Sequence, residues 1–193
     1  MTSSLNEGGT AVFRPSFGGL VLCLGGNPMK IFQVKQKFLS LGGHFTISDD
    51  LGIASYQVEG SFLKIPKTFT ISDMQGRKVS RIEKKPISFL PQFDIILADG
   101  TSFTIKKGLT FFKSRYHVQD LDMTVKGNLW DLNFSLQKGG HELATISQNL
   151  RHLTSTYTVD VYDENYSDLV ISLVIAIDYV KEQKAAQRSA NSI

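Results

Sequence analysis

The pattern of apolar and polar residues repeats along this chain in units of about 24 residues. The segment Phe45–Asp49 (FTISD) recurs as Phe69–Asp73 (FTISD), and a related segment begins at Phe93. Each segment alternates at period two and is followed by a turn whose glycine can adopt positive φ, at Gly52, Gly76 or Gly100. A second alternating stretch then follows, so each unit is predicted to be a β-hairpin.

Similar hairpins extend over most of the chain. Return strands are expected at 53–59, 77–83 and 101–107, after an opening strand at 31–37. Weaker copies of the unit begin at Tyr116, Phe134 and Tyr157. About a dozen short strands at spacings of roughly 8 to 12 residues are typical of a β-sandwich or a β-barrel.

The last unit is predicted to end in a helix, at residues 167–182, where a return strand is due. Ser167 can cap this helix, and Asp168 suits the positive end of its dipole. Between Leu169 and Ile177 only Ser172 and Ala176 are not large and apolar. A helix that is apolar on all sides must be buried in protein or in lipid.

The length of the apolar run decides between these two surroundings. A membrane span needs roughly 20 apolar residues, and Asp178 ends this run far short of that. We therefore expect one mainly β domain over residues 29–182, a closed antiparallel barrel of about twelve strands around the buried helix 167–182.

Both ends of the chain differ from this domain. Residues 1–28 are rich in Gly, Ser and Thr and end in the breaker Gly-Gly-Asn-Pro, which predicts a flexible tail or a start site placed too early, with Met29 opening the domain. A signal peptide fits less well, because Glu7 precedes the lone Arg14 and the apolar run 17–24 contains two glycines. Residues 183–193 are expected to form a disordered C-terminal tail.

Several segments, in order along the chain, resemble the LURP-one-related proteins. These segments are MKIFQVKQKFLSLGGHFTISDD, FLPQFDI at 89–95, FFKSRYHV at 111–118, GNLW at 127–130 and the terminal LVISLVIAIDYV. The resemblance spans Met29 to about Lys181 and connects the chain with tubby-like C-terminal domains and phospholipid scramblases. It implies a twelve-stranded barrel threaded by a central helix, but no defined biochemical activity.

The sequence contains few residues or motifs that are typical of catalytic or metal sites. The single cysteine, Cys23, excludes a disulfide framework and favours a cytoplasmic location. The histidines show no metal-ligand spacing, and no nucleophile elbow, P-loop or dinucleotide fingerprint is present; the histidines are His44, His117, His141 and His152. We therefore expect neither an enzyme nor a cofactor, although a site assembled from distant residues stays open.

An acidic cluster precedes the helix, where scramblases place a proposed calcium-binding segment. It consists of Asp160, Asp163, Glu164 and Asp168. The cluster lacks the alternate spacing and the glycine typical of calcium loops, so roles in the turn and at the helix start are favoured over calcium. The same departure counts against scramblase activity.

Charge is divided along the chain although the net charge is only +3. From Lys64 to Arg115 there are eleven Lys and Arg against four Asp and Glu, whereas Tyr116 to Glu182 has four against ten. The first stretch predicts a basic face that can hold phosphates, as the basic surface of tubby domains holds phosphoinositide headgroups. Its candidate residues are Arg77, Lys78, Arg81, Lys84, Lys85, Lys106, Lys107, Lys113 and Arg115.

Lysine-rich strands also protect sheet edges and keep proteins soluble, and this simpler explanation of the basic face is favoured over a bound ligand. The aromatic residues fall mostly at core-facing positions, so nucleic acid ranks below lipid or protein as a partner. The leading hypothesis is a cytoplasmic, non-catalytic module that binds an anionic phospholipid or an acidic protein. If the partner is a phospholipid, the protein is expected to be peripheral to the membrane. The alternative is a scramblase-like protein whose C-terminal helix inserts into lipid.

Overall fold

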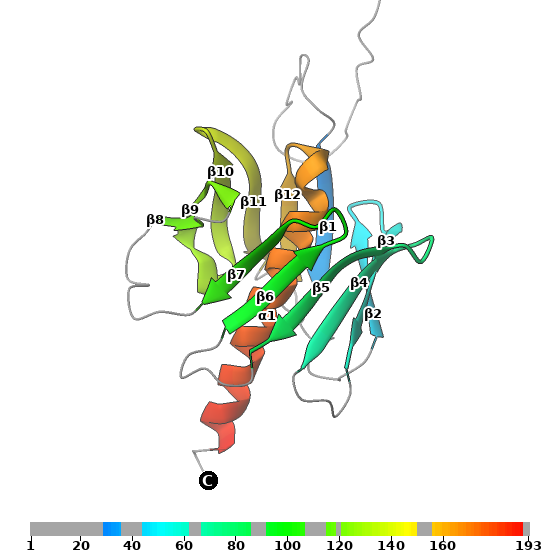
Figure 1. Ribbon diagram of the computed structural model, residues 1–193, viewed down its shortest axis with the longest axis vertical. Coiled ribbons are helices and arrows are strands. Elements are labelled where there is room, and N and C mark those ends of the chain that lie inside the picture. The colour runs from blue at the N-terminus through cyan, green and yellow to red at the C-terminus, as the bar shows by residue number, and fades with distance from the viewer. Residues whose placement is uncertain are drawn as a thin grey trace, which may run out of the picture.

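The computed structural model describes residues 29–35, 44–61, 67–85, 92–106, 115–118, 121–149 and 156–190. These residues form twelve strands and one long C-terminal helix, α1 (Ser167–Ala190) (Figure 1). The strands are β1 (Lys30–Lys35), β2 (His44–Asp49), β3 (Ala54–Gly60), β4 (Thr68–Asp73), β5 (Lys78–Lys84), β6 (Gln92–Leu97), β7 (Ser102–Lys106), β8 (Arg115–Val118), β9 (Met123–Asn128), β10 (Asn133–Lys138), β11 (His141–Asn149) and β12 (Thr156–Val161). Short 3-10 helices, η3 (Leu129–Asp131) and η4 (Glu164–Tyr166), precede β10 and α1.

All strands belong to one antiparallel sheet with the order β7-β6-β5-β4-β3-β2-β1-β12-β11-β10-β9-β8. The sheet curves around α1 (Figure 1). The mainly β prediction is confirmed, but the closed barrel is not, because no pairing among the described residues joins β7 to β8. These two end strands are short, with five and four residues, so they offer few backbone groups for closing the sheet.

The repeated hairpins share one turn geometry. The N–H of Asp49 donates to the carbonyl of Ile53 (2.8 Å), and the N–H of Gly52, at φ +81°, donates back to Asp49 (3.1 Å). This pattern is a type I turn closed by a glycine bulge. The same pair of bonds recurs from Asp73 and Gly76 in the second hairpin and from Leu97 and Gly100 in the third.

The aspartate of the repeated FTISD segment stabilises the turn that follows it by accepting backbone hydrogen bonds. Asp49 Oδ1 accepts the backbone N–H groups of Leu51 (3.0 Å) and Ile53 (2.8 Å). Asp73 Oδ1 accepts those of Gln75 and Arg77, each at 2.9 Å. The short carboxylate satisfies turn donors that would otherwise need water, which explains why Asp recurs at this position.

The core lies between the concave face of the sheet and α1. Every helix residue from Val170 to Asp178 is buried, and inward-facing side chains of the strands, such as Ile71, Ile82 and Ile95, are fully buried. The predicted buried helix is therefore confirmed. No helix in the described parts of the chain has the length and apolar content that a membrane crossing requires.

One polar contact crosses this apolar core. Ser80 of β5 and Ser172 of α1 are both fully buried, and their Oγ atoms lie 2.6 Å apart. Ser172 Oγ also lies 2.6 Å from the Asp168 carbonyl, to which it donates its proton. Ser80 is then the donor to Ser172. Both hydroxyl groups are therefore satisfied, and the contact helps set the position of α1 along β5.

α1 continues past Glu182, its expected end, to Ala190. Residues 183–190 are rich in Lys, Gln, Ala and Arg, which are strong helix formers, and a helix already anchored in the core extends at little cost. The N-terminal segment 1–28 and residues 191–193 lie outside the described residues.

Candidate anion-binding face

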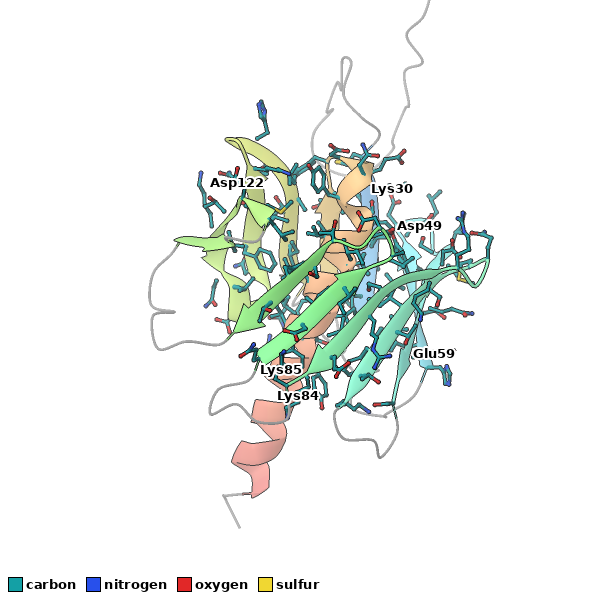
Figure 2. All side chains as sticks on the ribbon, in the orientation of Figure 1. Lys30, Asp49, Glu59, Lys84, Lys85 and Asp122 are labelled. Carbon is teal, nitrogen blue, oxygen red and sulfur yellow. The ribbon has the colours of Figure 1, made fainter. Side chains whose placement is uncertain are left out.

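Most of the basic residues expected to form the face follow a single strand, β5. Lys78 and Arg81 are exposed on its outer side, because Ile82 and its inward-facing neighbours point toward α1. Lys84 ends the strand and Lys85 follows it, and both stand at the same end of the sheet in Figure 2. Arg77 precedes β5 in the turn after β4. The structure thus brings Arg77, Lys78, Arg81 and Lys85 into one row, whereas Lys84 lies opposite the buried Phe93 and so belongs to the inner face at the end of the strand.

Carboxylates from the same strands interrupt the row. Arg77 Nε lies 2.6 Å from Asp73 Oδ2, and Arg81 Nη2 lies 3.1 Å from Glu83 Oε2. Lys85 Nζ lies 2.6 Å from Asp94 Oδ2 on β6. The row is therefore a mixed surface, and its positive potential is lower than the sequence suggested.

Two of these ion pairs shift pKa values. A hydrogen bond from Lys85 to Asp94, together with the attraction between the two charges, raises the pKa of Lys85 more than desolvation lowers it. Desolvation raises the pKa of Asp73, but hydrogen bonds from the backbone and side chain of Arg77 outweigh it, so the net shift is downward. Both groups therefore stay charged over a wider pH range than usual.

The remaining basic candidates are placed differently. Lys106 ends β7 opposite Gln92, whose carbonyl accepts the N–H of Lys85 at 2.9 Å, so Lys106 lies two strands from Lys85 at the same end of the sheet. Arg115 begins β8, at the other end of the strand order. Lys107 and Lys113 lie outside the described residues. Lys67 also lies beside this end of β5, since its carbonyl accepts the N–H of Lys84 at 3.0 Å, but its Nζ donates to the Ser61 carbonyl and lies over the Phe69 ring. No sequence signal singled out Lys67, because its place beside Lys84 depends on the β4–β5 register.

The acidic cluster before α1 is occupied by structural contacts. Asp163 accepts the backbone N–H of Asn165 (3.1 Å) and thereby caps η4. Glu164 pairs with Lys30 at 3.2 Å, while Asp160 lies on β12. Nowhere in the described chain do three or more histidine, cysteine or acidic side chains gather as a metal site would require. The roles at the turn and at the helix start thus have direct contacts.

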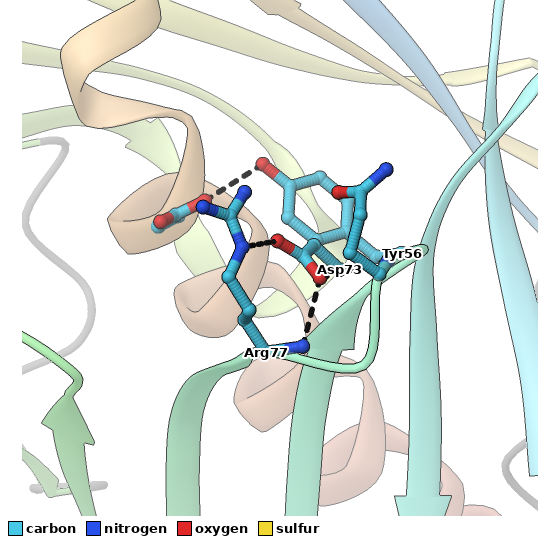
Figure 3. A network of polar contacts seen from close by, with 5 residues as sticks. Tyr56, Asp73 and Arg77 are labelled. Carbon is cyan, nitrogen blue, oxygen red and sulfur yellow. Dashed lines mark hydrogen bonds and ion pairs between the residues drawn. The ribbon is translucent and has the colours of Figure 1, made fainter.

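Asp168 belongs to a polar network that links the sheet to the start of α1 (Figure 3). Tyr56 of β3 donates its hydroxyl to Asp168 Oδ1 at 2.8 Å, and Asp73 and Arg77 complete the network nearby. Burial, followed by the negative charge of Asp168, raises the pKa of Tyr56, so its hydroxyl remains a donor. Sequence reasoning missed Tyr56, since its partner lies 112 residues away.

The described histidines lie on separate strands of the sheet. His44 Nδ1 lies 3.3 Å from Glu59 Oε1 across the β2–β3 pair, and both side chains are largely exposed. His141 is exposed at the start of β11, and His117 lies on β8. His152 lies outside the described residues.

The family model described as LURP-one-related matches residues 30–178. The chain belongs to the LURP-one-related family. The match begins with β1 and ends at Asp178, the last residue of the fully buried stretch of α1. The family unit is therefore the sheet together with the part of the helix that fills it. The resemblance seen in the sequence is confirmed.

Two individual proteins resemble this family member. Uncharacterized protein YxjI of Bacillus subtilis (strain 168) is 28% identical over 147 residues, which cover 76% of this chain and 74% of YxjI. A protein of Arabidopsis thaliana with an X-ray structure matches with a TM-score of 0.50 and 13% identity, covering 79% of this chain and 94% of its own. The second likeness shows the fold alone. Neither relative's name states an activity.

Proposed function

We propose that this LURP-one-related chain is a non-catalytic cytoplasmic module that binds an anionic partner, a phospholipid headgroup or an acidic protein, through the basic residues of β5 and its flanks. The observation that carries the proposal is the row of Arg77, Lys78, Arg81 and Lys85 along β5 and its flanks, with Lys84 at the end of the same strand. Arginine matches phosphate and carboxylate geometry with paired hydrogen bonds, and lysine adds point charge.

The ion pairs within the row do not exclude an incoming anion. The side chain of Arg77 is 79% exposed, and those of Arg81 and Lys85 are about half exposed. Exposed ion pairs contribute only about 0–1 kcal/mol, so a phosphate can replace the carboxylate partner with little loss. A binding face of this kind would favour partners that bring several charges at once.

Flotation with liposomes tests the proposal. Anionic vesicles should carry the protein upward at low salt and lose it at high salt, whereas neutral vesicles should not carry it, because exposed charges are screened over about 10 Å at 0.1 M salt. Lys78→Glu combined with Arg81→Glu should abolish flotation. The control with an equal change of charge is Lys126→Glu combined with Lys138→Glu, on β9 and β10.

Three results would count against lipid as the partner. These are equal flotation with neutral vesicles, no flotation at any salt concentration, or equal losses in the two charge-reversed pairs. The scramblase-like alternative requires α1 to leave the sheet and enter lipid. The burial of Val170 to Ile177 counts against it, since the same move would expose the inner face of the strands to water.

A further inference from the structure

Exposed apolar side chains gather at one end of the sheet. Among the described residues, five large apolar side chains are exposed, and four of them are Met29, Leu51, Ile53 and Met74. Leu51 is 79% exposed and Ile53 is 61% exposed. Met29 precedes β1, while the other three lie in or beside the β2–β3 and β4–β5 turns. We name these four residues the apolar tip; the fifth, Ile96, lies on β6.

Strand register places the members of the apolar tip side by side. The N–H of Asp50 donates to the carbonyl of Ile31 (3.1 Å), which joins the β2–β3 turn to the start of β1. Tyr56 pairs with Asp73, which sets the β2–β3 turn next to the β4–β5 turn. The bonds accepted by Asp49 and Asp73 fix both turns, so the tip is a pre-formed surface.

Negative charge surrounds the apolar tip. Carboxylates at this end of the sheet outnumber the cations, which are Lys30, Arg77, Lys78 and Lys138, the last lying over the ring of Tyr166. Lys30 and Arg77 already pair with carboxylates, Glu164 and Asp73. Figure 2 shows Lys30 and Asp49 at this end, opposite the end that holds Lys84 and Lys85. The carboxylates are Asp49, Asp50, Asp73, Asp163, Glu164 and Asp168.

Exposed apolar side chains next to carboxylates disfavour several classes of partner. Anionic lipid would be repelled by the carboxylates, and a second copy presenting the same tip would meet like charges. A polar cation would leave Leu51 and Ile53 in water. A partner must therefore bring both apolar side chains and positive charge.

We propose that the apolar tip docks a cationic, amphipathic helical segment of a partner protein. The apolar stripe of such a helix covers Leu51, Ile53 and Met74, while its Lys and Arg residues face the surrounding carboxylates. This surface meets the proposed anion-binding row at the β4–β5 turn, where Met74 belongs to the tip and Arg77 to the row, and the rest of the row runs along β5 toward the opposite end of the sheet.

Fluorescence anisotropy with two synthetic probes tests the proposal. The first is an amphipathic peptide of Leu and Lys, about five helical turns long, and the second replaces each Lys with Glu. The full chain should bind the Leu/Lys peptide and not the Leu/Glu peptide, with affinity that falls as salt rises. Leu51→Ser combined with Ile53→Ser should weaken binding by about tenfold or more, as expected for central contacts.

Matched variants distinguish docking at the apolar tip from nonspecific binding of the peptide to exposed apolar side chains. Ile96→Ser removes an exposed apolar side chain elsewhere and should leave binding unchanged. Asp50→Asn should weaken binding less than the double serine variant does. The proposal is overturned if the double variant binds like wild type, if Ile96→Ser has an equal effect, or if neither probe binds. It is also overturned if light scattering shows a dimer that the double variant dissociates.

Discussion

At the scale of single residues, two glycines with positive φ differ in their surroundings. A Cβ at Gly127, where φ is +106°, would lie 2.7 Å from the carbonyl oxygen of Asn133. A Cβ at Gly52, where φ is +81°, would meet nothing within 4 Å. Gly127 belongs to the GNLW segment through which the chain resembles its family, and this contact gives a physical reason for the glycine.

Gly127→Ala should therefore destabilise the fold more than Gly52→Ala. Both changes carry the cost of a side chain at positive φ, roughly 1–2 kcal/mol, but only Gly127→Ala adds an overpacking cost of roughly 1–3 kcal/mol. Urea denaturation of the two variants measures the difference in the free energy of unfolding. Equal losses would contradict the steric explanation.

The buried serine pair predicts coupled effects. Ser172→Ala leaves the Ser80 hydroxyl buried without its partner, which should cost about 1–3 kcal/mol. Ser80→Ala together with Ser172→Ala removes both polar groups and should cost less than the sum of the two single changes. A double-mutant cycle on unfolding free energies measures this coupling. Strict additivity would mean that the contact does not contribute to stability.

At the scale of elements, α1 packs in the interior of the curved sheet and forms part of the core. Val174 is fully buried in the stretch that faces the strands. Val174→Asp should unfold the domain, because burying a carboxylate costs several kcal/mol, comparable to a total stability of roughly 5–15 kcal/mol.

Circular dichroism and a thermal melt of Val174→Asp, purified without detergent, test this prediction. Ile96→Asp is the matched control, because Ile96 is 46% exposed on β6 and its replacement should shift the midpoint little. A native β spectrum with an unchanged midpoint for Val174→Asp would contradict the central role of the helix.

The elements that the sequence predicted well are those specified locally. The hairpins follow from period-two alternation and turn glycines, and β3, β5 and β7 begin within one residue of their expected starts. The helix follows from its all-round apolar run. Its C-terminal end was missed, because residues 183–190 have high helix propensity but no apolar pattern that would place them.

The candidate site was predicted less completely because it depends on register. Sequence spacing placed the cations of β5 together, but it could not show that Asp94 of β6 reaches Lys85. The link between Tyr56 and Asp168 likewise exists only once β3 lies beside the start of α1. Contacts between distant segments carry no local signature, so neither the charge balance of the row nor the network could be read from the chain.

At the scale of the whole molecule, the order of strands places the earlier and the later parts of the chain on different sides of β1. β4–β7 lie on one side of β1 and β8–β12 on the other, with α1 against the concave face (Figure 1). The cation-rich stretch from Lys64 to Arg115 thus falls mainly on the first side, although ion pairs within it reduce its potential.

The pairing of β1 with β12 ties the start of the domain to its end. Lys30 lies opposite Val161, and the helix that fills the sheet follows β12. During translation at about 5–20 residues per second, the first seven strands emerge well before their central partner has been made. The inner faces of these strands therefore stay exposed until α1 leaves the ribosome, and we expect the nascent chain to need protection from aggregation during that time.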